Sequence, residues 1–362
     1  MTADRRWVQR LIDEERSPAV LLLVAGLFGV IFANVADTSV IDRVLHFGPT
    51  AMPLVRFASE GLLVVFFYVA GLELRHELTQ GNLTSLRAAL VPVLAAALGM
   101  VIPALIFVAI DPSHASTAWG LPIATDLPLA LALLAIAGRA LPPGFRAFLL
   151  TLAIVDDALS IIVIAVAFGT HIALPWLACT AALVGMFALA VRRSGLLALV
   201  IAIASWLAML QTGIHPTVLG VALGLVTAGS TDAIRDRCQP YAAFVAVPVF
   251  ASTVLAVPIS GDAVDWRMVG ALTLARVAGK PIGILLGAML AVRLASPSEH
   301  LSPAMYARAG SVAGLGFSVS LLFADLALPA LERPSAIVAI LMALCAAAVA
   351  GTITLRRAPS TL

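Results

Sequence analysis

The chain has 362 residues, of which 61% are hydrophobic and 12% charged, and its formal net charge is +2. Soluble domains are about 45–50% apolar and about 25% charged, so this composition excludes a soluble protein. The scarcity of charge also excludes disordered and nucleic-acid-binding proteins. Three scattered cysteines, Cys179, Cys238 and Cys345, indicate neither a disulfide framework nor a zinc site. The sequence therefore predicts an all-α integral membrane protein, with residues 1–362 forming a single polytopic domain.

Twelve apolar runs are candidates for membrane-spanning helices, because a span needs about 20 mostly apolar residues. The runs are 18–36, 53–72, 88–110, 116–138, 145–169, 173–191, 195–211, 214–228, 241–260, 268–292, 304–326 and 334–355. With this even number of spans and a cytoplasmic amino terminus, most arginines, Arg356 and Arg357 included, fall in cytoplasmic segments. The positive-inside rule therefore predicts that both termini lie in the cytoplasm.

The segment 37–52 separates the first two spans and is the longest stretch predicted outside the membrane on the external side. It contains charged residues and a proline, which are typical of a solvated loop. The alternative is that the segment forms a small hairpin that makes a contact between subunits.

Charged side chains lie inside several of the predicted spans, where each costs at least about 2.5–3.5 kcal/mol and therefore needs a partner or a function. The candidates are Glu60, Asp126, Asp156, Asp157, Arg276 and Lys280. Lys280 is the only lysine in the chain, whereas the other basic residues are arginines. Because a buried lysine can lose its proton and an arginine cannot, this choice favours a titratable cation.

Asp156 and Asp157 are adjacent in the middle of an apolar run. Neighbouring residues point about 100° apart on a helix, so these two face different helices or line one cavity from two sides. Two carboxylates this close cannot both stay ionised without a counter-charge. Their oxygens suit hard cations such as Na⁺ or Li⁺, so protons and an alkali cation can compete for them. The alternative is a permanent salt bridge with Arg276 or Lys280.

Two spans contain helix breakers at membrane depth. Pro122 and Pro128 flank Thr125 and Asp126 in the fourth run, and three glycines lie within 310–316 of the eleventh. Unwound backbone is tolerated there only where it lines a cavity or is buried in protein, and a pair of such breaks is typical of a transporter's binding site. We expect Asp126 to offset the positive amino-terminal ends of half-helices, and Lys280 the negative carboxyl-terminal ends.

Six motifs in order along the chain resemble those of the NhaA-type sodium/proton antiporters of bacterial membranes. They occupy 66–73, 124–126, 153–157, 213–220, 279–283 and 314–318. The resemblance implies about twelve helices in inverted-topology repeats. It also implies that the fourth and eleventh helices are discontinuous and cross, and that a homodimer forms through an external hairpin.

The resemblance also implies roles for individual residues. Asp157 would be the principal cation and proton ligand, Asp156 would share the titration and pair with Lys280, and Thr125 would lie at the crossing beside the dipole-compensating Asp126. The residues implied for pH sensing are Glu73, Glu77 and His215.

We therefore predict a multi-pass protein of the bacterial inner membrane that exchanges cytoplasmic Na⁺ or Li⁺ for external H⁺ by alternating access. The transport is expected to be electrogenic and pH-regulated, to need no cofactor and to involve no enzymatic reaction. A sodium-coupled organic-anion transporter with a similar core is the alternative. An intramembrane aspartyl protease is disfavoured because Phe317 follows Gly314-Leu315-Gly316 where that chemistry requires aspartate.

Overall fold

The computed structural model describes residues 3–138, 141–169, 172–229, 231–259, 261, 264–295 and 300–357. Every regular element within these ranges is a helix. The chain divides into two compact units: unit 1 comprises residues 1–24, 82–157 and 257–362, and unit 2 comprises 25–81 and 158–256. Two helices, α1 (Ala3–Val35) and α7 (Pro143–Ala167), contribute to both units.

Six helical segments of the described chain are long and apolar enough to cross a membrane. They are Ser17–Val35, Leu54–Thr79, Leu86–Ile110, Pro143–Ala167, Trp266–Ala295 and Arg333–Arg356. A further pair of helices, Pro303–Ala313 and Ser318–Ala327, passes the same test together but is bent by 57° at its break. Each of the twelve predicted runs contains a helix. The protein is thus an all-helical multi-pass membrane protein, and the number of spans stays a prediction.

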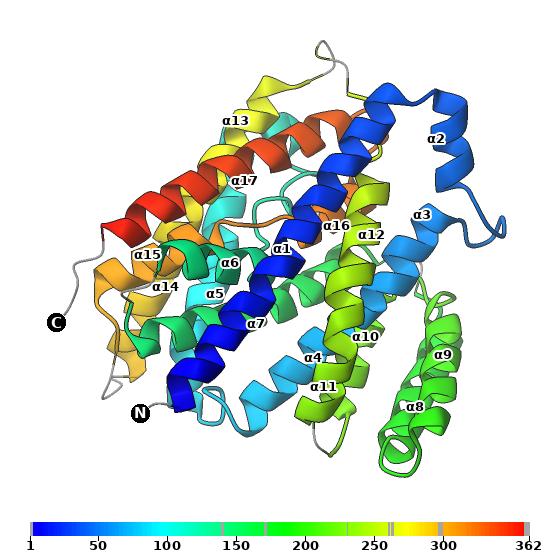
Figure 1. Cartoon of the computed structure of the whole chain (residues 1–362), viewed down its shortest axis with the longest axis horizontal. Coiled ribbons are helices and arrows are strands. Elements are labelled where there is room, and N and C mark those ends of the chain that lie inside the picture. The colour runs from blue at the N-terminus through cyan, green and yellow to red at the C-terminus, as the bar shows by residue number, and fades with distance from the viewer. Residues whose placement is uncertain are drawn as a thin grey trace. The chain divides into compact units, whose positions relative to one another are not determined.

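Unit 1 holds the helices that the site depends on. Besides parts of α1 and α7 they are α5 (Leu86–Ile110), η2 (Pro112–His114), α6 (Leu127–Ala137), α13 (Trp266–Leu274), η5 (Ala275–Gly279), α14 (Lys280–Ala295), α15 (Pro303–Ala313), α16 (Ser318–Ala327) and α17 (Arg333–Arg356). In Figure 1, α13 and α17 run side by side. The segment η5 is a π-turn, which joins α13 and α14 into one long helix.

Glycines allow α14 to pack directly on the backbone of α5. A Cβ atom added to Gly283 would lie 2.2 Å from the carbonyl oxygen of Leu98, and one added to Gly287 would lie 2.1 Å from that of Leu94. Small residues are the usual means of such close approach between helices in membranes. The contact fixes α14, which begins at Lys280, against the neighbouring helix.

Unit 2 is built from shorter helices. Besides parts of α1 and α7 they are α2 (Thr38–Leu45), α3 (Leu54–Phe57), η1 (Ala58–Leu62), α4 (Leu63–Thr79), α8 (Leu174–Ala190), α9 (Gly195–Met209), α10 (Thr217–Val226), α11 (Thr231–Tyr241), η3 (Ala242–Ala246) and α12 (Val247–Val254). The helices α8 and α9 pair with each other, as do α4 and α10.

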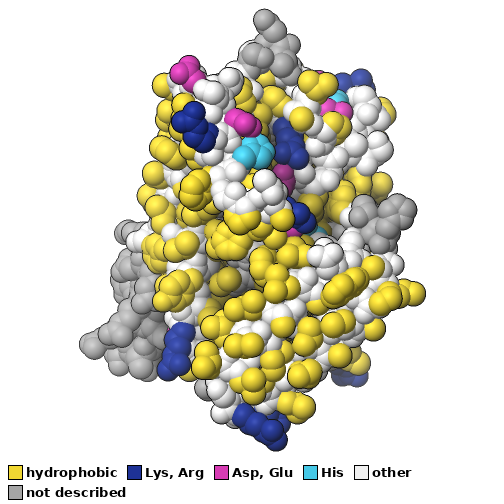
Figure 2. Space-filling view, turned by 90° about the vertical axis from the view of Figure 1, so that its right-hand side faces the viewer, with side chains coloured by type: hydrophobic (Ala, Val, Ile, Leu, Met, Phe, Trp, Pro, Cys, Tyr) yellow, Lys and Arg dark blue, Asp and Glu magenta, His cyan; other side chains and the backbone are white. Residues whose placement is uncertain are grey.

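Large apolar side chains cover the outward surface of α8 and α9. Leu174, Leu189, Leu196 and Leu207 are all more than half exposed. Figure 2 shows hydrophobic side chains spread over a broad face of the molecule, with Lys and Arg side chains at its lower edge. An apolar surface of this extent is expected of helices that face lipid, because water would not solvate it.

The segment 37–52 contains a short helix, where the sequence analysis predicted a solvated loop or a small hairpin, and a contact between subunits stays a prediction. α2 covers Thr38–Leu45, and Ile41 is buried in a cluster with Ala33 and Ala256 of the same unit. The apolar residues of this segment recur at helical spacing, which buries one side of a short helix. The charges and the proline of the segment favoured a loop, whereas the period of its apolar residues indicates the helix.

Candidate functional site

Both predicted helix breaks exist in the structure. The backbone of residues 115–126 forms turns and extended stretches before α6 begins at Leu127, and a gap of four residues separates α15 from α16. The two breaks touch, because the amide of Asp126 donates to the carbonyl oxygen of Leu315 at 2.6 Å. A Cβ atom on Gly316 would lie 2.3 Å from the carbonyl oxygen of Ala124, so only glycine permits this approach.

Lys280 links one break to the acidic pair. Its side chain is fully buried at the start of α14. The Nζ atom donates to Asp156 Oδ2 at 2.9 Å and to Thr125 Oγ1 at 2.9 Å. The Thr125 hydroxyl in turn donates to the carbonyl oxygen of Ala313 at 2.8 Å. One chain of contacts therefore runs from α7 through α14 to both breaks.

The acidic pair on α7 is buried, with Asp156 1% and Asp157 6% exposed. Asp156 Oδ1 has no hydrogen-bond partner among the described residues, and neither has the buried hydroxyl of Ser160. These two lie four residues apart and therefore share a face of the helix. An orphaned carboxylate oxygen in a buried place costs about 1–3 kcal/mol or more, so this oxygen is suited to take up a proton or a cation.

Asp126 caps two helices at once. Its Oδ1 accepts from the amide of Leu129 at 3.3 Å, which caps the amino terminus of α6. Its Oδ2 accepts from the amide of Ser318 at 3.1 Å and from the Ser318 hydroxyl at 2.7 Å, at the amino terminus of α16. A carboxylate at these positions interacts favourably with the positive ends of both helix dipoles.

Arg276 is the buried cation that holds the carbonyl groups of the breaks. Its guanidinium donates to the carbonyl oxygens of Gly316 and Leu121, the latter at 2.8 Å, and to the hydroxyl of Ser320. The Ser320 hydroxyl also donates to the Leu121 carbonyl oxygen at 2.9 Å. Arg276 therefore makes the contacts with the carbonyl groups, whereas a cation such as Lys280 was expected to offset the carboxyl-terminal ends of the half-helices.

The sequence drew attention to Arg276 as a charge at membrane depth and as a possible salt-bridge partner of Asp156 and Asp157. Its spacing of four residues from Lys280 would favour a shared face on an α-helix. The π-turn η5 (Ala275–Gly279) lies between them, and π-turns often occur at functional sites. No pattern in the sequence indicated which backbone groups the guanidinium would meet.

Glu60, the remaining charge predicted inside a span, lies in unit 2. Its Oε2 accepts from Arg56 Nε at 2.8 Å, and Trp206 Nε1 donates to its carbonyl oxygen at 2.6 Å. The charge is thus paired within its own helical segment.

The residues predicted to sense pH also lie in unit 2, but not in one cluster. Gly220 of α10 faces Val64 of α4, whereas the guanidinium of Arg75, further along α4, donates to Leu225 near the other end of α10. His215 precedes α10, and its Nδ1 contacts Thr217 Oγ1 at 2.8 Å. Glu73 and the buried Glu77 lie in the last part of α4. The imidazole and the two carboxylates therefore belong to opposite ends of this helix pair.

Comparison with known proteins assigns the family. The profile of the family described as Na⁺/H⁺ antiporter 1 matches residues 9–355. The chain belongs to this family. It is 38% identical over 352 residues to a Na⁺/H⁺ antiporter NhaA of Streptomyces antibioticus, covering 90% of this chain and 73% of that protein. It is 37% identical over 369 residues to the Na⁺/H⁺ antiporter NhaA 2 of Rhodococcus jostii, covering 93% and 89% respectively.

Membership of the antiporter family agrees with the buried polar arrangement in unit 1. Several acidic and basic side chains, a threonine and two unwound segments meet there, away from bulk water. Burying such a group of ionisable side chains in a membrane protein costs free energy, so the group is expected to bind an ion or a proton.

Proposed function

We propose that the chain exchanges cytoplasmic Na⁺ or Li⁺ for external H⁺ at a site formed by Asp156, Asp157 and Thr125. The observation that carries this proposal is the buried ion pair between Lys280 and Asp156, beside an Asp156 oxygen without a hydrogen-bond partner in the described chain. Carboxylate and hydroxyl oxygens suit a hard cation. The sodium/proton activity in the names of the relatives supports the same chemistry.

The exchange follows from competition for the same oxygens. In the sodium-free site Lys280 pairs with ionised Asp156, so the exchangeable protons are those of Asp157 and of the Lys280 ammonium group. When Na⁺ binds to the two carboxylates, Asp157 gives up its proton, and Lys280, whose attraction to Asp156 weakens, gives up a second. Protons then leave to the side from which Na⁺ came. After the site opens to the other side, protons return to Asp157 and Lys280 as Na⁺ leaves, and the Lys280 ammonium group pairs with ionised Asp156 again. Because the two carboxylates must hold either a proton or Na⁺, the site does not change sides while both are ionised and without a bound ion.

The two breaks supply the moving part in this proposal. Twelve spans in inverted-topology repeats, with the fourth and eleventh helices crossing at their breaks, would carry the site in alternating access. Asp126 and Arg276 would hold the half-helix ends together throughout the cycle, while Lys280 and Thr125 change partners. Their contacts with backbone groups, rather than with the acids, support this division.

The remaining features of the proposal concern the cell. The protein would lie in the bacterial inner membrane with both termini in the cytoplasm, which the distribution of arginines supports. We also propose a homodimer and a pH-dependent activity in which Glu73, Glu77 and His215 take part. Because His215 lies at the opposite end of the α4–α10 pair from the two glutamates, we expect it to contribute independently of them.

A sodium-coupled organic-anion transporter is the weaker alternative. It would need a cation for the anion, and Arg276 is the obvious candidate among the described residues. Its guanidinium is instead engaged by Gly316, Leu121 and Ser320. Family membership also favours proton exchange.

The substitution Asp157→Asn tests the proposal. It removes the charge with little change of size, so Na⁺-induced proton movement in proteoliposomes should be abolished while the protein stays folded. Asp325→Asn is the matched control, because Asp325 pairs with Arg333 at 3.1 Å in the same unit but outside the site. Full Na⁺/H⁺ exchange by the Asp157→Asn protein, at the rate of the control, would overturn the site assignment.

A further inference from the structure

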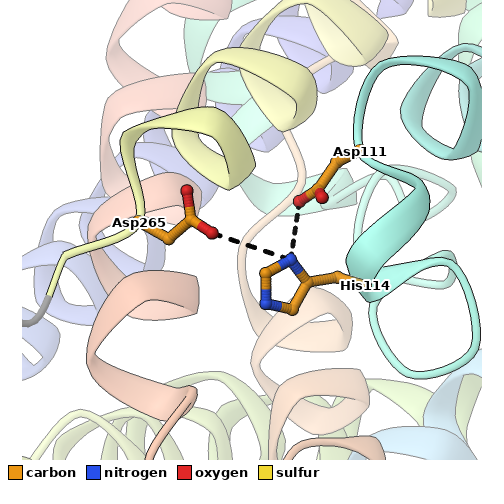
Figure 3. A group of neighbouring side chains, drawn as sticks. All are labelled: Asp111, His114 and Asp265. Atoms are coloured by element: carbon orange, nitrogen blue, oxygen red, sulfur yellow. Dashed lines mark hydrogen bonds and ion pairs between the residues drawn. The ribbon is translucent and has the colours of Figure 1, made fainter.

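A second group of ionisable side chains lies in unit 1, outside the ion-exchange site. Figure 3 shows His114 between Asp111, at the end of α5, and Asp265, immediately before α13. His114 Nδ1 lies 2.8 Å from Asp111 Oδ2 and 3.9 Å from Asp265 Oδ2. One ligand-type atom from each residue lies within 4.8 Å of the other two. The proposed exchange mechanism uses none of these residues.

We propose that Asp111, His114 and Asp265 form a binding site for a divalent metal ion of the Zn²⁺ or Mn²⁺ type. One imidazole nitrogen and two carboxylate oxygens are a common donor set for such ions, and water completes the coordination. Zinc binds these donors at about 2.0–2.2 Å, so two donors of a tetrahedral site lie about 3.3–3.5 Å apart. The separations of 2.8 and 3.9 Å from His114 bracket this value.

The structure holds each carboxylate with one oxygen directed towards the imidazole. Asp111 Oδ1 accepts from the Ser113 hydroxyl, which leaves Oδ2 for His114. Asp265 Oδ1 accepts from the amides of Arg267 and Met268 at 2.8 and 3.4 Å, which caps α13 and leaves Oδ2 on the side of His114. Contacts of this kind orient metal ligands and raise their affinity.

Burial and access also suit a metal. Asp111 is fully buried, so its charge is poorly solvated and gains from a cation. The side chains of His114 and Asp265 are 15% and 40% exposed, which leaves an approach from solvent. The amide of Asp265 donates to Ser335 Oγ at 2.9 Å, so a bound metal would connect the end of α5 with the starts of α13 and α17.

Isothermal titration of the purified, chelator-treated protein with ZnCl₂ and with MnCl₂ tests the proposal. The unmodified protein should bind one equivalent of at least one of the two ions. His114→Gln and Asp265→Asn should each lower the affinity by at least about 100-fold, since even residues that only support metal ligands contribute 10–100-fold. Asparagine still caps a helix, so Asp265→Asn removes the anionic ligand and keeps the local fold.

His46→Gln is the matched control. His46 also contacts an aspartate, Asp42, at 2.9 Å, but this pair is exposed and has one carboxylate. The control should bind the metal as tightly as the unmodified protein. Absence of binding, or equal binding by His114→Gln and Asp265→Asn proteins that elute as folded species, would overturn the proposal. A thermal unfolding midpoint that rises with neither metal would also contradict the proposal.

Discussion

Arg276 and Lys280 are four residues apart in the chain and yet contact different kinds of group. Lys280 meets a carboxylate and a hydroxyl, whereas Arg276 meets backbone carbonyl groups and Ser320. The planar guanidinium has five donors in a fixed arrangement and is charged under all ordinary conditions, which suits a permanent contact. The ammonium group of lysine can lose its proton when it is buried, which suits a contact that must break during transport.

Arg276→Gln should therefore destabilise the protein more than it alters ion binding. The substitution removes the guanidinium donor from the carbonyl oxygens of Gly316 and Leu121, of which the Leu121 oxygen keeps the Ser320 hydroxyl. A buried carbonyl group that loses its donor costs about 1–3 kcal/mol. We expect a lower thermal unfolding midpoint in detergent and a slower exchange in proteoliposomes. Ser320→Ala, which removes one hydroxyl and keeps the guanidinium, should lower the midpoint less. An unchanged midpoint in Arg276→Gln would mean that the guanidinium does not stabilise the breaks.

At the scale of elements, the site depends on two helices that begin at the breaks. α6 and α16 both begin at the carboxylate of Asp126, which receives the amides of Leu129 and Ser318. The unwound segments before these helices approach each other at Gly316 and Ala124. The two breaks leave backbone amide and carbonyl groups without partners inside a helix. Asp126 accepts from the amides at the positive ends of the helix dipoles, and Arg276 donates to carbonyl groups of the breaks.

Gly316→Ala should separate the breaks and abolish exchange. The new methyl group would lie 2.3 Å from the carbonyl oxygen of Ala124, so the backbone must move. Sodium-dependent proton transport in proteoliposomes measures the loss. Gly270→Ala is the control, because a Cβ atom at this position in α13 meets nothing within 4 Å, and alanine favours a helix by up to about 1 kcal/mol. Equal transport by the two variants would exclude a functional role for the close approach.

At the scale of the whole molecule, the response of transport to the membrane potential depends on how many protons leave for each Na⁺. If both acids, or one acid and Lys280, release protons, each cycle moves a net charge. A membrane potential then contributes about 2.3 kcal/mol per charge for every 100 mV. This energy corresponds to a change of about 50-fold in the sodium gradient at equilibrium.

Imposing a potassium diffusion potential on proteoliposomes should therefore shift the final sodium gradient in the direction set by its sign. The gradient is measured from the distribution of radioactive Na⁺ once transport has stopped. Vesicles without an imposed potential serve as the control. The same final gradient at every potential would show an electroneutral exchange of one proton for one Na⁺, and would contradict the proposed release of two protons.

Much of the candidate site could be predicted from local sequence features. Asp156, Asp157 and Lys280 are conspicuous because charges are rare at membrane depth, and prolines and glycines mark the two breaks. The ion pair between Lys280 and Asp156 was among the expected contacts and is present in the structure. The position of Arg276 at the carbonyl groups was not predictable, because it depends on the packing of three segments that are distant in the chain.

The sequence by itself determined that this is a helical membrane protein with broken spans and buried acids, because hydropathy, helix breakers and misplaced charges act locally. Only the tertiary structure decided which buried groups meet. It directed Arg276 to the breaks, folded 38–45 into a helix and brought Asp265 to His114. Such contacts depend on side-chain directions that a few ångströms of helix packing determine, and residues far apart in the chain carry no local record of them.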